Sequence, residues 1–477
     1  MKLRELLNGI EFETRYTLNP EITGVTEDSK KVRNSSAFVC IKGCNNDGHS
    51  FARKAVDRGA AVVICDHDIG IRNSVIVKDT RKAYALICSN FYGNCHRMMK
   101  MIGVTGTNGK TTTTFILKKI LEANGYKVGI IGTVEVIIGN EKYSAEYTTP
   151  DPAVLHRYFY MMKMAGCDVC IMETSSQALA QLRTYGIDFD IGLFTNLSNE
   201  HLDFHHSMNE YASAKAMLMK SSDICIINAD DKYADYMKDN AKNKAVTYAI
   251  DSQADIKAEN VLLYHDGVNY KLKFAHGECP IEYKSIGKFS VYNSLAALSV
   301  ATIMGLDMKR SSSAVARMKT VKGRIEKVPN EKNINILIDF AHTPDSLENV
   351  LKSVKDIYDK RLIVVFGCGG DRDKEKRPLM GKIAVKTADV VFVTSDNPRT
   401  ENPDSIIDDI VNGLNKSSYI RITDRTEAIR AAIIEAKPGD TVLIAGKGHE
   451  NYQIVGTDKI HYDEREIIRQ ILDDEAD

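Results

Sequence analysis

Short apolar runs separated by polar, amphipathic stretches recur along most of this chain, and they predict strands that alternate with helices. The first part has three such runs, and a longer amphipathic stretch from Thr80 to Phe91 predicts a helix. A polar, glycine-bearing stretch from Tyr92 to Lys100 then predicts a linker. The three predicted strands are Ala37–Ile41, Ala60–Cys65 and Ser74–Val77.

The middle of the chain repeats strand and helix more regularly, which is typical of a mostly parallel, doubly wound sheet. Between Tyr248 and Ser285 the pattern changes to alternating apolar and polar residues, which predicts an added antiparallel section. The predicted strands are Val128–Ile131, Asp168–Met172, Asp190–Phe194, Ile224–Ile227, Val261–Tyr264 and Tyr270–Phe274, and the predicted helices are Pro152–Ala165, Asn209–Met219 and Tyr292–Met304.

After Gly323-Arg324 the strand–helix alternation restarts and predicts a second, Rossmann-like unit. Because 477 residues suggest about three domains, we predict an α/β protein with domains at 1–97, 98–325 and 326–477. The predicted strands of the last domain are Asn335–Asp339, Leu362–Phe366, Val390–Val393 and Thr441–Ala445, and its helices are Ser346–Tyr358, Gly381–Thr387 and Thr426–Glu435.

A glycine-rich loop joins the apolar Met101-Ile102 to a helical run from Thr112 to Leu121. Glycines let backbone N–H groups face an anion, and the helix N-terminus adds positive charge. Lys110 can reach the phosphates and Thr111 can bind magnesium. Val104 stands where the general phosphate-loop pattern has glycine, and glycines 103, 106 and 109 form a related loop. The sequence therefore predicts that Gly106, Thr107, Asn108, Gly109, Lys110, Thr111 and Thr112 bind a nucleotide.

Composition removes several other classes of function. The net charge of −1 and the lack of a basic cluster argue against nucleic-acid binding. No apolar run approaches the ~20 residues of a membrane span, and the first residues lack a signal-peptide core. Ten scattered cysteines suit reduced thiols, so we expect a cytoplasmic protein. Cys167 and Cys170 lie among apolar residues and predict a buried strand rather than half a zinc site.

Chemistry-bearing side chains follow two predicted strands of the middle section. Glu173 ends one strand near the phosphate loop, where a carboxylate can hold magnesium. Ser175 and its neighbours also fit a helix N-cap. The histidine- and aspartate-rich stretch after Phe194 makes His201 a candidate second metal ligand. By its spacing alone, Lys215 is expected to be a surface lysine on the next helix.

Three polar loops follow strands of the last section: Cys368 to Arg377, Asp396 to Arg399, and Gly446 to Glu450. Each alone fits a solvated turn. Because the carboxyl ends of parallel strands share one edge of a sheet, the loops together predict a pocket for a zwitterion. Arginine binds carboxylates through two hydrogen bonds, so the arginines of these loops are candidates to grip it. Arg324, Asp339 and His342 likewise lie at a section boundary and at a strand end.

These motifs together make the chain resemble the Mur ligases of peptidoglycan synthesis. The resemblance runs from Asp28-Ser29-Lys30 to Gly446-Lys-Gly-His-Glu450. The motifs that carry it are Gly-Thr-Asn-Gly-Lys-Thr-Thr from Gly106, Thr148-Thr149-Pro-Asp, Glu173-x-Ser-Ser, Asn199-Glu-His-Leu-Asp, Asp339-x-Ala-His-Thr-Pro and Asp396-Asn-Pro-Arg399.

The resemblance implies a UDP-binding N-terminal domain, a central ATPase and a C-terminal domain that receives an amino acid. It implies ATP-dependent addition of meso-2,6-diaminopimelate to UDP-N-acetylmuramoyl-L-alanyl-D-glutamate through an acyl phosphate, with Mg²⁺ and ATP as cofactor and co-substrate. It further implies a cytoplasmic monomer that neither enters membranes nor binds nucleic acid.

Residue roles carry over onto matching positions. The resemblance implies that Lys110, Lys215, Glu173 and His201 are catalytic, that Lys215 is carried as its carbamate, and that Thr111, Glu173 and His201 hold magnesium. ATP would also contact Asn293, Arg324, Asp339 and His342. The UDP-dipeptide would contact Ser29, Thr148, Thr149, Ser175, Gln181 and Arg183, and diaminopimelate would contact Arg372, Asp396, Asn397, Pro398, Arg399, Gly446 and Glu450.

Three alternatives stay open. A lysine-adding ligase of the same family would have no reason for Arg399, since lysine lacks the distal carboxylate that a guanidinium would bind. An enzyme resembling folylpolyglutamate synthase would not explain Asp28-Ser29 and the N-terminal section. A non-catalytic, nucleotide-binding relative would not be expected to keep Lys110, Glu173, His201 and Lys215.

Overall fold

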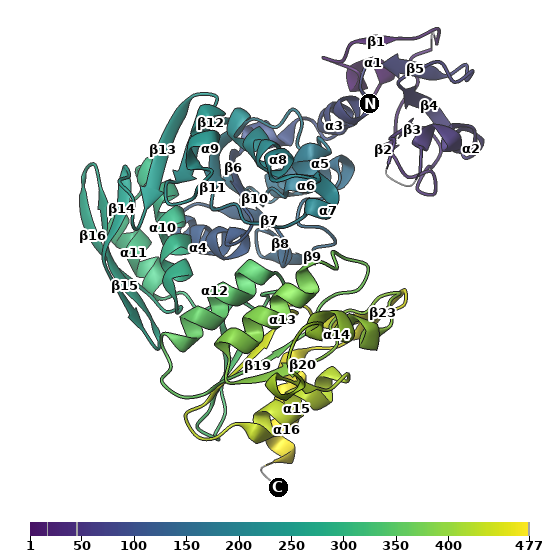
Figure 1. The fold of residues 1–477 in the computed structure, drawn as a ribbon. Coiled ribbons are helices and arrows are strands. Elements are labelled where there is room, and N and C mark those ends of the chain that lie inside the picture. The colour runs from purple at the N-terminus through teal and green to yellow at the C-terminus, as the bar shows by residue number, and fades with distance from the viewer. Residues whose placement is uncertain (17, 44–45, 476–477) are drawn as a thin grey trace.

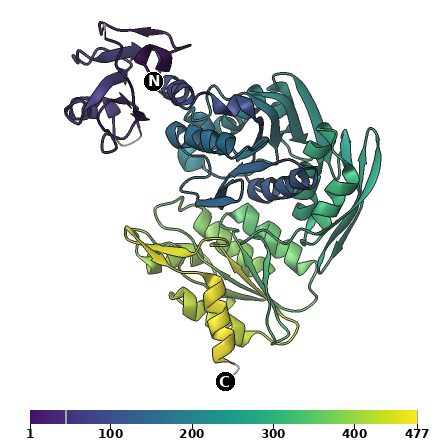
Figure 2. The same cartoon turned by 180° about the vertical axis from the view of Figure 1, so that it is seen from behind.

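The computed structural model of this chain describes residues 1–16, 18–43 and 46–475. Three α/β domains follow one another along the chain, with the central one between the other two (Figure 1). The view from behind shows the same row, with the N-terminal and C-terminal domains at opposite ends of the molecule (Figure 2). Within the described residues, no helix is long and apolar enough to cross a membrane.

The N-terminal domain is a sheet in the order β1-β5-β4-β3-β2, in which β2 to β5 run parallel and β1 runs antiparallel. Leucines of α1 and the apolar face of α3 cover one face, and alanines of α2 cover the other. The strands are β1 (Phe12–Glu13), β2 (Gly24–Thr26), β3 (Ser36–Val39), β4 (Ala60–Cys65) and β5 (Ser74–Val77); the helices are α1 (Leu3–Leu6), η1 (Gly48–Phe51), α2 (Ala52–Asp57), α3 (Thr80–Phe91) and η2 (Cys95–Met98).

The central domain holds a sheet in the order β16-β15-β14-β13-β12-β11-β6-β10-β7-β8-β9. The strands from β14 to β7 in this order run parallel, while β15, β16, β8 and β9 are antiparallel additions. The strands are β6 (Lys100–Thr105), β7 (Val128–Ile131), β8 (Glu135–Ile138), β9 (Glu141–Ser144), β10 (Val169–Glu173), β11 (Phe189–Phe194), β12 (Ser222–Asn228), β13 (Lys244–Ala249), β14 (Ile256–Tyr264), β15 (Gly267–Phe274) and β16 (Gly277–Tyr283).

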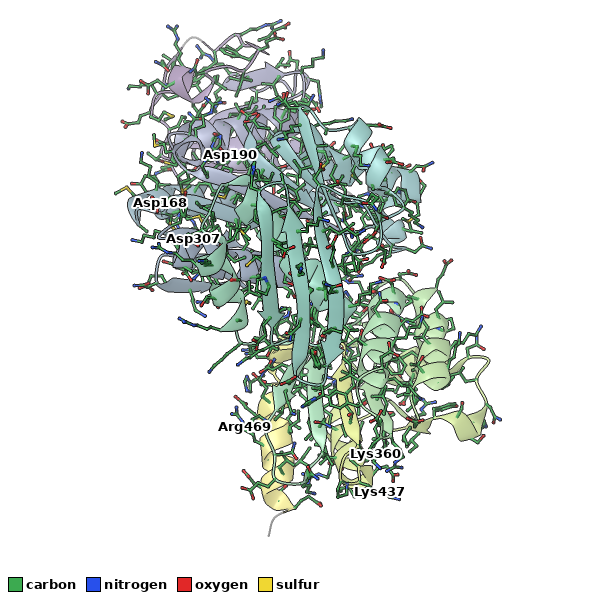
Figure 3. All side chains as sticks on the ribbon, turned by 90° about the vertical axis from the view of Figure 1, so that its left-hand side faces the viewer. Asp168, Asp190, Asp307, Lys360, Lys437 and Arg469 are labelled. Atoms are coloured by element: carbon green, nitrogen blue, oxygen red, sulfur yellow. The ribbon has the colours of Figure 1, made fainter. Side chains whose placement is uncertain are left out.

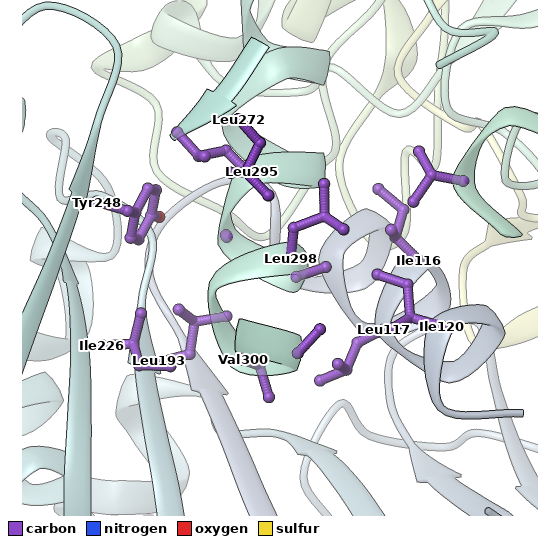
Figure 4. Close-up of a cluster of buried hydrophobic side chains, with 14 of the residues drawn as sticks. Ile116, Leu117, Ile120, Leu193, Ile226, Tyr248, Leu272, Leu295, Leu298 and Val300 are labelled. Atoms are coloured by element: carbon purple, nitrogen blue, oxygen red, sulfur yellow. The ribbon is translucent and has the colours of Figure 1, made fainter. Parts of the chain in front are cut away.

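Helices cover both faces of this sheet. The helices are α4 (Lys110–Ala123), α5 (Pro152–Met164), α6 (Ser176–Ala180), α7 (Leu202–His205), α8 (Met208–Lys220), α9 (Ala234–Asp239), α10 (Lys288–Ile303) and α11 (Met308–Ala316). On one face, Ile116, Leu117 and Ile120 of α4 pack with Leu295 and Leu298 of α10 over the strands (Figure 4). The phosphate-loop helix is thus anchored in the core, which fixes where its N-terminus points.

The C-terminal domain holds a sheet in the order β17-β18-β22-β19-β20-β21, parallel except for β17. Helices α12, α13 and α14 cover one face, and α15 and α16 cover the other. The strands are β17 (Glu326–Val328), β18 (Asn335–Asp339), β19 (Leu362–Phe366), β20 (Val390–Val393), β21 (Ile420–Arg421), β22 (Thr441–Ala445), β23 (Tyr452–Val455) and β24 (Asp458–His461); the helices are α12 (Pro344–Lys355), α13 (Lys376–Thr387), α14 (Pro403–Val411), η3 (Lys416–Ser418), α15 (Arg425–Glu435) and α16 (Glu464–Asp474).

The amino ends of the parallel strands lie on the edge away from the candidate site. Asp190 accepts a hydrogen bond from the Met101 backbone N–H at 2.8 Å, and Asp168 accepts one from the Lys127 N–H at 2.7 Å. Figure 3 labels both aspartates, and it labels Lys360 and Lys437 at the far end of the C-terminal domain. The opposite edges, at the carboxyl ends, carry the loops that the sequence singles out.

The predicted fold class is confirmed, and several predicted elements have the same bounds in the structure, among them β4, β5, β7 and α3. The linker prediction is partly wrong, because Cys95–Met98 form a 3-10 helix and Lys100 already begins β6. Cys167 and Cys170 are buried as predicted, and all nine cysteines among the described residues are free.

Candidate active site

The phosphate loop connects the end of β6 to the start of α4. In the sheet, β6 lies between β10 and β11. Gly106 and Gly109 have φ of +151° and +86°, conformations that favour glycine. A side chain on Gly109 would overlap Asn293 of α10, so Asn293 lies directly on the loop. The ammonium group of Lys110 donates to the Gly106 and Thr107 carbonyls at 2.8 and 2.9 Å. Thr112 is half-buried in the first turn of α4.

Gly103 has a different role from the one its spacing suggests. It lies inside β6, where a Cβ would come 2.6 Å from the Leu218 side chain and 3.0 Å from Phe189. Its missing side chain makes room for packing of α8 on the sheet rather than for a phosphate. The glycines of the loop proper are Gly106 and Gly109.

Glu173 ends β10 as predicted and is fully buried. Its carboxylate accepts hydrogen bonds from the Thr111 hydroxyl at 2.9 Å, from the Thr133 hydroxyl at 2.9 Å and from the Thr133 N–H at 3.0 Å. No Lys, Arg or His nitrogen among the described residues lies within 4 Å of it. Two predicted magnesium ligands, Thr111 and Glu173, are therefore hydrogen-bonded to each other.

His201, the third predicted magnesium ligand, contacts Glu200 instead. Its Nε2 lies 3.7 Å from Glu200 Oε1, and His342 Nε2 approaches the same oxygen at 3.6 Å. Burial would raise the pKa of Glu200, but His342, His201 and Lys110 hold that pKa well below its ordinary value. Glu200 thus joins a histidine of the central domain to one of the C-terminal domain.

Lys215 lies on α8 and is only 1% exposed, so its expected surface position is wrong. Its ammonium group donates to the Gly106 carbonyl at 2.7 Å and lies 4.6 Å from the centre of the Tyr211 ring. Burial, and then the nearby Lys110, lower the pKa of Lys215 well below its ordinary value. The buried amine is therefore held toward its neutral form.

Arg324 and Asp339 lie where the chain passes from the central to the C-terminal domain. The Arg324 guanidinium stacks 4.5 Å from the Phe340 ring centre and comes 3.5 Å from the Thr111 hydroxyl. Both Asp339 oxygens accept backbone N–H groups, those of Ile325 and Ala341, each at 2.8 Å. Burial raises the pKa of Asp339, and Arg324 opposes this shift. Arg324 therefore borders the phosphate loop, while Asp339 holds the connection between the domains.

Five of the six residues predicted to bind the UDP-dipeptide form one connected group beside Glu173. Arg183 donates to the Thr149 carbonyl at 2.8 Å and to Gln181 Oε1 at 2.8 and 3.1 Å. The Thr149 hydroxyl accepts from the Ser175 N–H at 3.0 Å, and the Thr148 hydroxyl lies 3.0 Å from that of Thr133.

Ser29, the sixth, lies in the N-terminal domain, where its carbonyl accepts from Arg58 at 2.5 Å. Its neighbour Glu27 lines a cavity of ≈ 50 Å³ shared with Arg81, Asp151, Gln181 and Arg183. The N-terminal domain thus meets the dipeptide group through Glu27 and Arg81, which the sequence did not single out.

The predicted zwitterion loops of the C-terminal domain also converge. A Cβ on Gly369 would lie 2.9 Å from the Arg399 guanidinium and 3.9 Å from Arg372, so the two arginines lie side by side. Arg399 donates to the Gly370 carbonyl at 2.8 Å. Among the described residues, no carboxylate lies within 4 Å of either guanidinium. Burial and then Arg372 lower the pKa of Arg399, while Asp396, Glu450 and Asp371 oppose this shift.

The other residues predicted to bind the zwitterion contact one another on the neighbouring loops. Asn397 donates to Glu450 at 2.9 Å and accepts from buried Lys447 at 3.0 Å. A Cβ on Gly446 would lie 2.8 Å from Asp396. These loops therefore combine two guanidinium groups that lack a carboxylate within 4 Å among the described residues with the carboxylates of Asp396 and Glu450, the charge pattern that a zwitterion needs.

One part of the predicted charged loop is not solvated. Arg377 is fully buried at the start of α13, where it pairs with Glu401 at 2.9 Å and with Asp409 at 2.8 Å. Burial of a charge is tolerated when it is paired in this way. The turn before it carries Arg372 as expected.

Family models match three consecutive parts of this chain. The model for the Mur ligase family catalytic domain matches residues 21–92, that for the Mur ligase middle domain residues 104–301, and that for the Mur ligase glutamate ligase domain residues 323–448. The UDP-N-acetylmuramoyl-L-alanyl-D-glutamate–2,6-diaminopimelate ligase 1 of Clostridium acetobutylicum is 43% identical over 478 residues, which cover 99% of each chain. This chain belongs to the Mur ligase family.

Other Mur ligases agree in sequence and in fold. The UDP-N-acetylmuramoyl-L-alanyl-D-glutamate–2,6-diaminopimelate ligase of Caldanaerobacter subterraneus subsp. tengcongensis is 44% identical over 479 residues, 99% of each chain. A solved structure of a ligase with this same name superimposes with a TM-score of 0.73 and 32% identity, over 100% of this chain and 99% of that one.

Sequence reasoning missed several residues that this Mur ligase places in the candidate site. Asp345 at the start of α12 accepts hydrogen bonds from the Asn108 amide at 2.8 Å and from the Ser198 hydroxyl at 3.0 Å, across the domain boundary. Asn196 Oδ1 accepts from the Asn108 N–H at 2.8 Å. Glu200 belongs to the Asn199-Glu-His-Leu-Asp motif, and its position next to His201 could have indicated a role in the site. No sequence pattern indicates such a role for Thr133 or Asp345.

Proposed function

We propose that this chain is the ATP-dependent ligase that adds meso-2,6-diaminopimelate to UDP-N-acetylmuramoyl-L-alanyl-D-glutamate in peptidoglycan synthesis. One observation carries the proposal: a phosphate loop hydrogen-bonded to a buried carboxylate contacts the C-terminal domain through Asp345, and that domain carries two arginines that lack a carboxylate partner within 4 Å among the described residues. The full-length relatives that bear this ligase name support it.

The phosphates of ATP would lie over the N-terminus of α4. There the loop N–H groups and the helix dipole favour an anion, and Lys110 needs only to leave the Gly106 and Thr107 carbonyls to reach the phosphates. Asn293 supports the loop from α10, Arg324 approaches from the connection between the two domains, and His342 approaches from the C-terminal domain. Such preorganised cations stabilise the charge of a transferring phosphoryl group.

The oxygen-rich set around Glu173 fits Mg²⁺. The buried carboxylate has hydroxyl neighbours and no cation within 4 Å among the described residues, and oxygen donors are what this ion prefers. Thr111 and Glu173 would hold it, with His201 as the third predicted ligand. When bound, the ion would neutralise phosphate charge.

Lys215 would act as its carbamate. Because its buried amine is held toward the neutral form, the nitrogen lone pair can attack the carbon of CO₂, with loss of one proton. The product is an anion beside the phosphate loop, where it joins Glu173 and Glu200 as a negative charge near Lys110. This exchange of a disfavoured buried cation for an anion near cations is electrostatically favourable.

The reaction has two steps. The γ-phosphoryl group of ATP passes to the D-glutamyl carboxylate and gives ADP and an acyl phosphate. The neutral amine of diaminopimelate then attacks the carbonyl carbon, phosphate leaves with the bonding electron pair, and the nitrogen loses a proton to form the amide. Contacts between the domains, such as those of Asp345, would help to exclude water that hydrolyses the acyl phosphate.

The choice of amino acid would rest on Arg399 and Arg372. Diaminopimelate differs from lysine by a distal carboxylate, which a guanidinium can bind through two hydrogen bonds. Lysine would leave that guanidinium unpaired, and a missing polar partner can discriminate by ~10⁴. Asp396, Asn397, Pro398, Gly446 and Glu450 would line the rest of the pocket.

The other parts of the proposal follow from the same placement. Thr148, Thr149, Ser175, Gln181 and Arg183 would hold the dipeptide end of the nucleotide substrate and Ser29 its UDP end, with domain boundaries at 1–97, 98–325 and 326–477. We further propose that the protein acts as a monomer. Use of ATP and a UDP-linked precursor supports a cytoplasmic location.

The decisive experiment is an amino-acid panel with the purified protein. Phosphate release from ATP should require both the UDP-dipeptide and an amino acid, and meso-diaminopimelate should give by far the highest kcat/KM. Equal turnover of lysine and diaminopimelate would remove the proposed specificity, and phosphate release that ignores the UDP-dipeptide would remove the ligase assignment.

Matched arginine variants separate recognition from stability. Arg399→Lys should lower kcat/KM for diaminopimelate by about 10²-fold while the KM for ATP stays unchanged, because the forked contact is lost. Arg421→Lys, an exposed arginine of the same domain that pairs with Asp404 and Asp408, should leave both values unchanged.

A further inference from the structure

A second cluster of metal-ligating side chains lies in the N-terminal domain, apart from the site described above. His49 stands in η1, and Asp66 and His67 directly follow β4. One nitrogen of each histidine and one oxygen of Asp66 all lie within 4.8 Å of one another. His49 Nε2 is 3.2 Å and His67 Nδ1 is 2.5 Å from Asp66 Oδ1. Three potential ligand atoms therefore point at a common centre.

The hydrogen bonds of His49 to Asp47 orient its ring so that the lone pair of Nε2 faces that centre. Asp47 Oδ1 accepts from the His49 backbone N–H at 3.0 Å and lies 2.6 Å from its ring Nδ1. A neutral ring has one N–H, and the Asp47 carboxylate takes it. The Nε2 lone pair then lies 3.5 Å from the Asp66 backbone N–H, which donates to it, and 3.2 Å from the Asp66 carboxylate. A cation bound by both atoms would remove the repulsion between the lone pair and the carboxylate.

The donor set selects the class of cation. Two imidazole nitrogens and one carboxylate oxygen suit zinc and similar transition metals rather than Mg²⁺ or Ca²⁺. Zinc–ligand bonds of ~2.0–2.1 Å at tetrahedral angles put neighbouring donor atoms ~3.3 Å apart. The 3.2 Å between His49 and Asp66 is close to this spacing, whereas the 2.5 Å between His67 and Asp66 has to lengthen, which the exposed His67 side chain can do. A carboxylate on the far nitrogen of a ligating histidine, as Asp47 is here, is the usual support of such sites.

We propose that His49, Asp66 and His67 bind a divalent transition-metal ion of the zinc class, with Asp47 orienting His49. Three protein ligands leave a fourth position for water. The ion would tie η1 to the exit of β4 and so brace this end of the N-terminal domain. The proposal is independent of the ligase assignment, because none of these residues belongs to the clusters around Lys110, Arg183 or Arg399.

The test is calorimetric titration of the intact protein with ZnCl₂ in a buffer with excess Mg²⁺, which occupies oxygen-only sites. The wild-type protein should bind one more zinc equivalent than His67→Gln or Asp66→Asn. The His67 side chain is 61% exposed, so its replacement leaves the core intact, and a thermal melt without zinc checks this. Zinc should raise the melting temperature of the wild-type protein more than that of His67→Gln.

Two further variants make the result specific. Asp47→Ala removes no ligand but should weaken zinc binding by about 10–100-fold, as expected when the partner of a ligating histidine is lost. His461→Gln alters an exposed histidine whose Nε2 lies 2.7 Å from Glu466 Oε2. This variant should bind zinc as the wild-type protein does. The proposal fails if His67→Gln and wild type titrate alike, or if His461→Gln loses as much zinc as His67→Gln.

Discussion

Lys215 is a buried amine whose pKa is lowered first by burial and then by Lys110, a charge of the same sign. Replacing it by alanine removes the amine that would become a carbamate, so Lys215→Ala should lower kcat by about 10²–10³-fold, as loss of a group that positions phosphoryl charge does. Short carboxylic acids added to the assay should restore part of the activity, because they can supply the missing anion.

Lys215→Arg is the matched control, since it keeps a cation but cannot form the carbamate. It should be as inactive as Lys215→Ala and should not respond to added acids. Full activity of either variant, measured by phosphate release, would contradict the role of Lys215.

A pair of buried histidines makes stability depend on pH. His96 and His156 lie edge to face with ring centres 5.5 Å apart, and none of their ring nitrogens has a hydrogen-bond partner among the described residues. Burial lowers the pKa of His96 to about 4 and that of His156 to about 3. Below the ordinary histidine value of ~6.5, the unfolded chain binds protons that the folded chain does not.

The contribution of these two histidines to the free energy of unfolding is therefore fully present above pH ~6.5 and is lost as the pH falls toward 4. His156→Phe removes one of these groups and can pack on Phe159, 5.4 Å away. The variant should be at least as stable as wild type at pH 7 and should lose less free energy of unfolding between pH 7 and pH 5, measured with urea. A loss equal to that of the wild type would show that His156 does not titrate in this way.

At this scale the sequence predicts chemical type better than environment. Glu173 and Arg399 were singled out because one ends a strand and the other lies on the loop after a strand, where ligands of such sheets bind. By its spacing alone, Lys215 is expected on the surface. This expectation is wrong because its helix, α8, buries residues on more than one side, including Tyr211, Ala212 and Ala216. A pattern that assumes one buried face cannot reveal a lysine beneath the phosphate loop.

At the scale of elements, fully buried strands were the easiest to predict. All residues of β19 and β22 are buried, so apolar runs mark their ends sharply. Several missed elements are short or exposed: both residues of β1 and of β21 face solvent, and α1 spans only Leu3–Leu6. The hydrogen bonds of β1 and β21 to neighbouring strands, rather than their own composition, define these two strands. The helices α14 and α16 are longer and were also missed.

The loop that carries Arg399 depends on a close backbone approach. A Cβ on Gly370 would overlap the Pro398 carbonyl oxygen, and Gly370 itself accepts the Arg399 hydrogen bond. Gly370→Ala should therefore displace Arg399, raise the KM for diaminopimelate and cost ~1–3 kcal/mol of stability. Steady-state kinetics with both substrates check this, and the KM for ATP should not move.

Gly24→Ala is the matched control, because its Cβ would meet only the Ser36 hydroxyl at 3.8 Å. If Gly370→Ala keeps the wild-type KM for the amino acid, the loop does not position Arg399 as described.

At the scale of the whole molecule, the sequence predicted three domains but not how they meet. Apolar periodicity reports which face of an element is buried within a domain. The contacts between domains add isolated apolar residues, such as Ile286 against the C-terminal core, and polar side chains. Glu27 and Arg81 at one boundary, and Asp345 at the other, look like ordinary charged surface residues in the sequence.

Asp345 couples the C-terminal domain to the phosphate loop. Its carboxylate accepts from Asn108 and Ser198, and hydrogen bonds to a charged group contribute ~1.5–3 kcal/mol. Asp345→Ala should lower kcat by about 10-fold and make the average molecule more open, which small-angle X-ray scattering detects as a larger radius of gyration.

Glu348→Ala serves as the control on the same helix, where Glu348 pairs only with Lys352. It should change neither kcat nor the radius of gyration. Unchanged scattering and kcat in Asp345→Ala would mean that this contact does not hold the domains together.

Arg399 adopts φ = +52°, a left-handed conformation that costs a residue with a side chain ~1–2 kcal/mol relative to glycine. The residue that would read the substrate is thus poorly suited to its own backbone. A screen for thermostability alone would reward glycine at this position and erase the choice between diaminopimelate and lysine. Engineering of this enzyme for heat resistance therefore has to select for activity at the same time.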